Sequence, residues 1–330
     1  MKKISWGVIG CGNVTEVKSG PAFQKVPDSS LVAVMRRDAD KAADYAQRHG
    51  VPKWYNRAED LIADPDVTAV YIATPPAFHE KYALAAMQAG KPVYIEKPFS
   101  STLEGCYRMQ EAAQKSGIPL SVAHYRRALP KFITIRKMLQ EDAIGKINTV
   151  QIRMNLPDQS VELAARGENN WRIIPAISGG GIFFDLAPHQ IDLLIFFFGK
   201  ALDFCGNASN QAGLYDAEDT VSGTARLPNG IDFSGEWCFC APDSSREDVI
   251  EIIGTKGKMI FSTFGHDLRI VSGSGEEKID FNPPNHIQQP MIEKVTQYFL
   301  GKGPNPCSAE DAILSFLLMD AFTQKYYQRD

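Results

Sequence analysis

A glutamate and a lysine stand side by side at the end of an apolar run. Val93–Ile95 read as a short buried strand, and Glu96, Lys97 and Pro98 follow it directly. Ligands bind beyond the carboxyl ends of the strands in open parallel sheets, so a charged pair there indicates a ligand site. An ammonium group at such a place can hydrogen-bond a substrate hydroxyl and stabilise negative charge that develops on its oxygen. Glu96 either contacts a ligand or serves only as a local partner of Lys97.

A second set of polar side chains lies in an apolar stretch further along the chain. Asp185, His189 and Asp192 are spaced four and three residues apart, and residues at this spacing share one face of a helix. Pro188 disturbs a continuous helix, so it marks either a kink or a later helix start. Histidine titrates near neutral pH, which makes His189 a natural general base for a substrate hydroxyl. The alternative is a buried histidine satisfied by a neighbouring carboxylate.

A glycine turn follows the first predicted strand. The segment GVIGCGNVT places Gly10 and Gly12 at the first two positions of the dinucleotide fingerprint, with Thr15 at the third. Glycines there let the backbone turn tightly and approach a pyrophosphate at the start of a helix. The strand before and the helix after supply the context that the motif needs. We therefore predict cofactor contacts from Gly10, Gly12, Asn13 and Val14.

The second strand, Leu31–Met35, ends on arginines instead of an acidic residue. A carboxylate at this position binds the adenosine ribose of NAD, whereas guanidinium groups pair with the 2′-phosphate of NADP. Arg36 and Arg37 therefore favour NADP(H) over NAD(H). The alternative is that both arginines are solvated loop residues and that Asp38 only caps the next helix.

The elements that must position these groups change in kind near residue 124. Strand and helix signals alternate up to that point, which predicts an α/β Rossmann domain with a doubly wound parallel sheet at 1–124. From 125 to 330, long strand signals predict an α+β domain with a large, mostly antiparallel open sheet for substrate binding and oligomerisation. The C-terminal helix belongs to this domain and can pack back on the first one.

Composition excludes several classes of protein. The formal charge of −4 over 330 residues gives no general attraction to nucleic acid or anionic membranes. Apolar runs fall short of a membrane span. The six cysteines and six histidines show no metal-ligand spacing, so we expect no metal site. With no export signal recognised, we expect reduced thiols and a cytoplasmic location.

Taken together, the motifs resemble the glucose–fructose oxidoreductase, inositol dehydrogenase and MocA-like family. The matching segments are GVIGCGN at the start, TPPAFH at 74–79, EKP at 96–98, YRR at 125–127, NWR at 170–172 and DLAPHQID at 185–192. The resemblance implies that Lys97 lies beside the nicotinamide and that Asp185 and His189 face it from the second domain. It also implies cofactor contacts from Thr74, Pro75, His79, Glu96, Trp171 and Arg172. The alternatives are that His79 only caps a helix, that Trp171 is a core aromatic and that Arg172 is a surface charge. Tyr125 and Arg126, with Arg127, are expected to shape the substrate pocket.

These expectations define a reaction. We predict an NAD(P)-dependent dehydrogenase or reductase acting on CH–OH groups, with hydride passing between the cofactor and a secondary alcohol or ketone of a sugar, cyclitol or dihydrodiol. Two alternatives stay open: redox-assisted glycoside cleavage or epimerisation with a tightly held cofactor, and a non-catalytic redox sensor. Tyr125 competes with His189 as the acid or base. We expect substrate selectivity from loops around 155–180, and a homo-oligomer, a dimer or tetramer, formed through the open sheet.

Overall fold

The computed structural model describes residues 2–158 and 170–329. The chain divides into two compact units, Met1–Leu129 with Pro284–Ile313, and Pro130–Pro283 with Leu314–Asp330. A late segment of the chain therefore belongs to the first unit, beyond the boundary expected near residue 124.

The first unit is built on a parallel sheet of six strands. Their order is β3-β2-β1-β4-β5-β6, which is the strand order typical of dinucleotide-binding domains. The strands are β1 (Ile4–Ile9), β2 (Ser29–Met35), β3 (Lys53–Tyr55), β4 (Ala69–Ile72), β5 (Val93–Ile95) and β6 (Leu120–Val122). Every residue of β4, β5 and β6 is buried, because helices cover both faces of a doubly wound sheet. The predicted Rossmann class is confirmed.

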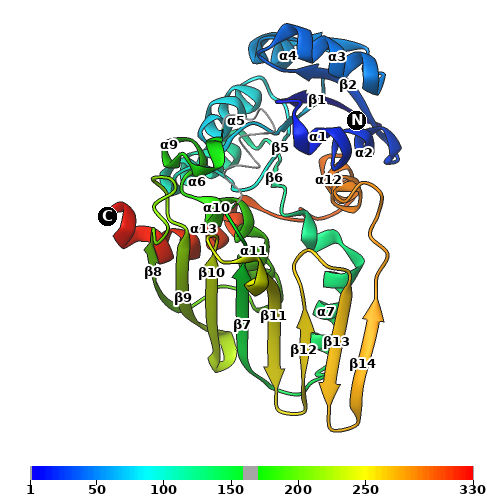
Figure 1. Cartoon of the computed structure of the whole chain (residues 1–330). Helices are drawn as coiled ribbons and strands as arrows, with labels where there is room; N and C mark the ends of the chain where they lie inside the picture. Colours follow the sequence, from blue (N-terminus) through cyan, green and yellow to red (C-terminus); the bar gives the residue numbers. More distant parts are fainter. Residues whose placement is uncertain (1, 159–169, 330) are drawn as a thin grey trace. The chain divides into compact units, whose positions relative to one another are not determined.

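Short helices connect these strands and flank the sheet (Figure 1). They are α1 (Asn13–Val17), α2 (Gly20–Lys25), α3 (Ala39–His49), α4 (Ala58–Ala63), η1 (Pro76–Phe78), α5 (His79–Gln88), α6 (Leu103–Ser116), η2 (Tyr125–Ala128) and α12 (Gln289–Phe299). Asp38 caps α3 by accepting a hydrogen bond from the Lys41 amide at 3.1 Å, as predicted. Thr102 caps α6 in the same way through the Gly105 amide.

The second unit contains a sheet of eight strands in the order β14-β13-β12-β11-β7-β10-β9-β8. The strands are β7 (Ile147–Asn155), β8 (Asp203–Ser209), β9 (Thr220–Leu227), β10 (Ile231–Cys238), β11 (Glu247–Gly254), β12 (Gly257–Phe261), β13 (Asp267–Ser272) and β14 (Gly275–Asp280). Neighbouring strands run antiparallel except for β7 and β10. The predicted open, mostly antiparallel sheet is confirmed.

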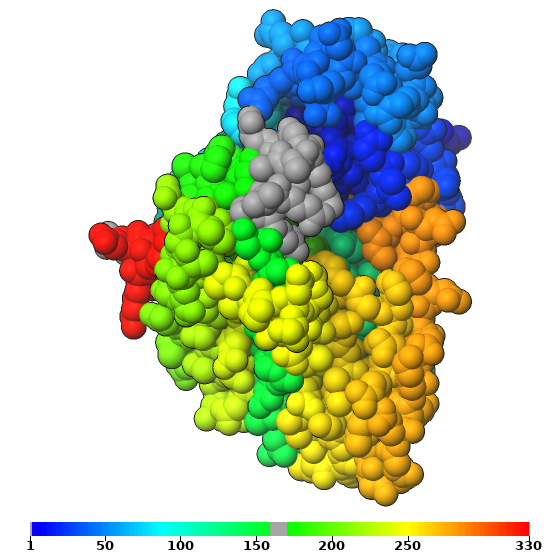
Figure 2. Space-filling model, viewed as in Figure 1, coloured from blue at the N-terminus to red at the C-terminus, as the bar shows by residue number. Residues whose placement is uncertain are grey.

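The two faces of this sheet differ in chemistry. Along β9 and β10, buried and exposed residues alternate, with Phe233 and Trp237 on the buried face. Trp237 packs edge-on against Phe183, and Phe233 stacks parallel to Phe322. Figure 1 shows the helix α7 (Pro130–Gln140) behind the strands, and in Figure 2 the strand segments reach the surface side by side. One face is therefore the core and the other is polar and open.

The second unit also contains helices, and two of them, α10 and α11, carry the polar residues of the DLAPHQID motif. They are α7 (Pro130–Gln140), η3 (Trp171–Ile173), α9 (Pro175–Ser178), α10 (Ile182–Leu186), α11 (Pro188–Phe198), η4 (Pro228–Gly230), η5 (Asp243–Ser245) and the long α13 (Ala309–Tyr327), which begins in the first unit.

Within the described residues, no single helix has the length and apolarity to cross a membrane. One bent pair, Pro175–Leu186 with Pro188–Phe198, meets the length and composition criteria only when its two halves are joined. Over the same residues, no cluster of three potential metal ligands occurs.

Candidate active site

The turn after β1 requires glycine at position 10. Gly10 has a φ of +94°, and a Cβ atom there would lie 2.9 Å from the backbone of Ala73 and from Cγ2 of Thr74. Only glycine adopts this conformation readily, and only glycine leaves room for the end of β4. Gly10 therefore brings the glycine turn against the segment that begins with Thr74.

Gly12 and Thr15 complete the turn. Gly12 is the N-cap of α1 and receives no side-chain cap, and a Cβ there would meet nothing closer than the Gly10 carbonyl at 3.9 Å. The fully buried Thr15 donates its hydroxyl to the Gly12 carbonyl at 2.8 Å. The threonine at the third fingerprint position thus fastens the turn from inside, while the backbone around Gly12 leaves space for a ligand. Asn13 and Val14 form the first turn of α1, and Asn13 is exposed.

Arg36 and Arg37 follow β2 at the same end of the sheet. A guanidinium nitrogen of Arg36 donates to the Cys11 carbonyl of the glycine turn at 3.3 Å. The exposed Arg37 lies over the ring of Phe78, 5.4 Å from its centroid. The two cations are thus held beside the turn by different contacts, and both keep a positive charge at this edge of the first unit.

His79 lies inside the protein and joins two loops. Its Nε2 is 2.8 Å from the Thr74 carbonyl and its Nδ1 is 3.2 Å from the Phe99 carbonyl. Burial lowers the pKa of His79 to about 4, although the carbonyl partners act in the opposite direction. The imidazole links the loop after β4 with the loop that carries Lys97. Any effect of His79 on cofactor binding would therefore be indirect, through the positions of these two loops.

A buried network fixes Glu96. Its Oε1 accepts the Tyr71 hydroxyl at 2.5 Å and the Gln288 side-chain amide at 2.8 Å. Its Oε2 accepts the backbone amide of Lys97 at 3.2 Å. Burial, with the Glu96 charge beside it, holds the pKa of Tyr71 well above its usual range. Tyr71 therefore stays a hydroxyl donor. Glu96 thus anchors the segment of Lys97 on its N-terminal side. On the C-terminal side, the Phe99 carbonyl contacts the His79 ring.

Tyr125, Arg126 and Arg127 form the short helix η2 and are all buried. The Arg126 guanidinium lies over the Tyr125 ring at 5.3 Å and donates to its hydroxyl at 3.4 Å. Arg127 pairs with Asp311 at 2.8 Å. Arg127 thus joins η2 to the start of α13, and Arg126 faces the phenol of Tyr125.

In the second unit, the helix breaks between Asp185 and His189. Asp185 lies in α10, which ends at Leu186, and α11 starts at Pro188, where a proline is tolerated because the first amides of a helix have no partner. The two segments are bent by 64°. Pro188 therefore marks a later helix start, which was one of the two alternatives. The three polar residues expected on one face of a single helix are divided between α10 and α11.

Asp185 has a partner that its motif did not indicate. The Arg172 guanidinium donates to the Asp185 carboxylate at 2.9 Å, and it also lies 4.5 Å from the ring centroid of Trp171. Trp171 is half-buried, so it is not a core aromatic. The Trp171–Arg172 segment therefore orients the carboxylate of Asp185.

His189 is 5% exposed and lies in the first turn of α11. Its neighbour Gln190 is fully buried and accepts the Trp237 indole at 2.6 Å. Gln190 also donates to Asp248 at 3.3 Å. One turn later, the carboxylate of Asp192 accepts the Ser315 hydroxyl at 3.4 Å. The hydrogen bonds of Gln190 and Asp192 thus fix the position of the helix that carries His189.

Both halves of the chain match models of one family. Residues 4–124 match the GFO_IDH_MocA model, described as an oxidoreductase family with an NAD-binding Rossmann fold. Residues 132–260 match the GFO/IDH/MocA C-terminal domain. The chain belongs to the GFO/IDH/MocA oxidoreductase family.

Similar proteins cover nearly the whole length of this family member. Oxidoreductase P35 of Formosa agariphila is 44% identical, over 97% of this chain and 98% of the relative. A 1,5-anhydro-D-fructose reductase of Ensifer adhaerens is 27% identical, over 94% of this chain and 92% of the relative. A solved levoglucosan dehydrogenase, in complex with NADH and levoglucosan, has a TM-score of 0.85 at 23% identity and covers 99% of this chain and 98% of its own.

Sequence reasoning on this GFO/IDH/MocA oxidoreductase found the motif residues but missed their supports. Tyr71 and Gln288 hold Glu96, yet neither belongs to a motif, and Gln288 lies 192 residues away in sequence. Gln190 lies within the DLAPHQID segment without a predicted role, and Asp248, which accepts its hydrogen bond, lies outside every motif. Of the loops around 155–180 that we expect to govern selectivity, residues 159–169 lie outside the described residues.

Acid should destabilise this protein through His79. The folded pKa of about 4 lies below the ordinary 6.5, so the unfolded chain binds a proton first as the pH falls. The contribution of the neutral imidazole to the free energy of unfolding is complete above pH 6.5 and is lost as the pH falls toward 4. The loss amounts to about 2 kcal/mol by pH 5. We expect urea unfolding of His79→Gln to show a pH dependence that is weaker by this amount. His266→Gln, a control on an exposed histidine, should follow the wild type. If the free energy of unfolding of His79→Gln varied with pH as it does in the wild type, His79 would not be the cause of the acid sensitivity.

Proposed function

We propose that this oxidoreductase transfers a hydride between NADP(H) and a secondary alcohol or ketone of a sugar, cyclitol or dihydrodiol. The observation that carries the proposal is the pinned Lys97 segment, fixed by Glu96 before it and by the His79–Phe99 contact after it. Enzymes preorganise charged donors in this way where charge develops during reaction. The names of the reductase and dehydrogenase relatives support the substrate class.

Each residue has a defined task in this reaction. The nicotinamide, when bound, supplies the hydride acceptor or donor. His189 takes the proton of the substrate hydroxyl, and in the reverse direction it returns that proton to the alkoxide. Lys97 hydrogen-bonds the same oxygen and stabilises its negative charge. Asp185, oriented by Arg172, accepts a hydrogen bond from a neighbouring substrate hydroxyl.

The glycine turn and the two arginines beside it would together suit a dinucleotide with a 2′-phosphate. Gly10 allows the tight turn, and the backbone around Gly12 leaves the space that a pyrophosphate needs. Arg36 and Arg37 supply the cations for the additional phosphate, as NADP requires. The aliphatic stems of both side chains let their guanidinium groups adjust to a bound phosphate.

Removing these cations should abolish the preference for NADP(H). A hydrogen bond to a charged group contributes about 1.5–3 kcal/mol, which corresponds to roughly 10- to 150-fold in affinity. We expect the double variant Arg36→Ala/Arg37→Ala to bind NADPH weaker by about this factor and NADH nearly as before. Fluorescence titration of both cofactors measures it. Arg57→Ala, which removes an exposed arginine, should leave both affinities unchanged. A wild type that prefers NADH contradicts the proposal.

The substrate class is tested with a panel of polyols, cyclitols, dihydrodiols and keto-sugars. Each compound is incubated with NAD or NADP in either redox state, and absorbance of the reduced nicotinamide reports turnover. We expect turnover of ring alcohols or their ketones with NADP(H). Binding of NADPH without turnover of any compound would favour the redox-sensor reading instead.

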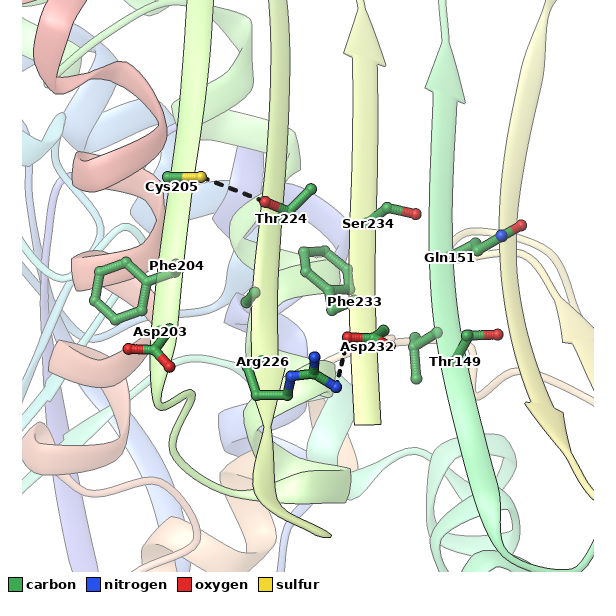
Figure 3. Close-up of a pocket in the computed structure, with 12 residues that line it drawn as sticks. Thr149, Gln151, Asp203, Phe204, Cys205, Thr224, Arg226, Asp232, Phe233 and Ser234 are labelled. Atoms are coloured by element: carbon green, nitrogen blue, oxygen red, sulfur yellow. Dashed lines mark hydrogen bonds and ion pairs between the residues drawn. The ribbon is translucent and has the colours of Figure 1, made fainter. Parts of the chain in front are cut away.

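We also propose that the open sheet face joins copies of the chain. Figure 3 shows a groove across β8, β9, β10 and β7, with Thr224, Arg226 and Asp232 among its lining residues. Arg226 and Asp232 form an ion pair at 2.8 Å across neighbouring strands. An open face with paired charges and hydroxyl groups suits a polar interface between copies. Light scattering after size exclusion gives the oligomer size.

A further inference from the structure

An exposed aromatic side chain lies beside the candidate base. Phe264, in the loop between β12 and β13, is a large apolar side chain with 43% exposure. Its ring centroid is 5.8 Å from that of His189, and the two rings are nearly perpendicular at 87°. This edge-to-face arrangement is favourable for aromatic rings. An apolar surface therefore adjoins the imidazole that would take the substrate proton.

The loop that carries Phe264 is held firmly. The Lys131 ammonium, only 4% exposed, donates to the Ser262 carbonyl at 2.6 Å and to the Gly265 carbonyl at 2.9 Å. The Gly265 amide donates to the Ser262 hydroxyl at 2.9 Å. Burying a lysine is costly unless its ammonium group is well bonded. A buried cation thus closes the loop on both sides of Phe264.

The same carboxylate fixes both Phe264 and the helix of His189. Asp248 accepts the Phe264 backbone amide at 2.9 Å through one oxygen. Its other oxygen accepts the side-chain amide of Gln190, the residue after His189, at 3.3 Å. The exposed ring and the imidazole are therefore positioned against each other by one network. An aromatic ring so fixed, yet left open to solvent, is placed to contact a ligand.

We infer that Phe264 determines substrate specificity by packing against the apolar C–H face of a ring-shaped polyol. This inference rests on the proposed function, because it places the ring beside the hydroxyl whose proton His189 takes. A pyranose or cyclitol presents a flat patch of C–H groups that an aromatic face can cover, whereas an open-chain polyol does not hold such a patch. A phenylalanine has no polar group to satisfy, so it selects for shape and apolar contact.

The experiment compares ring and open-chain alcohols in Phe264→Ala. We expect its KM for ring substrates to rise about tenfold, with kcat and the pH profile retained, while open-chain polyols change less than twofold. Phe264→Tyr keeps the aromatic face and should behave as the wild type. Leu214→Ala, which removes another exposed apolar side chain, is the control. A merely structural role would lower kcat for both substrate classes, and that result overturns the inference.

A binding measurement separates this inference from the reaction itself. Saturation-transfer NMR with a methyl glycoside and a cyclitol, in the presence of NADPH, should transfer magnetisation from the wild type to the ring C–H protons. In Phe264→Ala, this transfer should fall severalfold. If the wild type turns over no alcohol, the proposed function fails, and the NMR result still decides the role of Phe264. No transfer in the wild type, or equal transfer in both proteins, overturns the inference.

Discussion

Replacing Lys97 by methionine should reduce hydride transfer by about 10²- to 10³-fold, which is the effect of removing one preorganised donor from a developing oxyanion. Methionine retains most of the length of the side chain but removes the ammonium charge. NADPH affinity should stay within about threefold, because in our proposal the glycine turn and the arginines provide the main cofactor contacts. Single-turnover kinetics with NADPH and fluorescence titration separate the two quantities.

The surroundings of Lys97 make this a test of chemistry rather than of folding. The backbone of the segment is held by Glu96 and by the His79–Phe99 contact, and neither contact uses the lysine side chain. Lys115→Met, on an exposed helix position with an ion pair to Glu111, is the matched control. Normal turnover by Lys97→Met would show that the lysine has no part in the reaction.

The fold could be predicted where burial imposes a pattern. Apolar runs such as Ile4–Ile9 and Ala69–Ile72 are buried central strands, and their alternation with helices predicts the parallel sheet. β14 gave no such signal, because Gly275–Asp280 is an exposed edge strand with almost no apolar residues. β3 is three residues long, too short for a period to show. An edge strand is held by its neighbour's backbone, which no side-chain pattern records.

The candidate site was predictable where one short segment contains the whole reason for a residue. The positive φ at Gly10 and the cap at Asp38 are local requirements, and both residue types indicate them. The ion pair between Arg172 and Asp185 joins two different segments of the chain, so it is not a local requirement. Neither is the contact of Gln288 with Glu96. Such pairs are created by the tertiary fold, so a single sequence indicates the candidate site residues but not those that support them.

Replacing His189 by asparagine should lower kcat by about 10²- to 10⁴-fold, the usual contribution of a positioned general base. The acidic limb of the pH–rate profile should disappear with it, because that limb requires a group that loses its function when protonated. Asparagine is polar and smaller, and the bonds of Gln190 to Trp237 and Asp248 keep α11 in place. Stopped-flow oxidation of the best ring alcohol across pH 5–9 measures both effects.

Chemical rescue distinguishes a base from a support. His189→Ala leaves space for an imidazole molecule, and added imidazole should restore part of the rate in a concentration-dependent way if the lost function is proton transfer. His266→Asn, on an exposed histidine, should retain wild-type kinetics. If His189→Asn kept both the rate and the acidic limb, the proton would have to leave through another group. Tyr125 would then be the next candidate, because its hydroxyl already accepts a hydrogen bond from the Arg126 guanidinium at 3.4 Å.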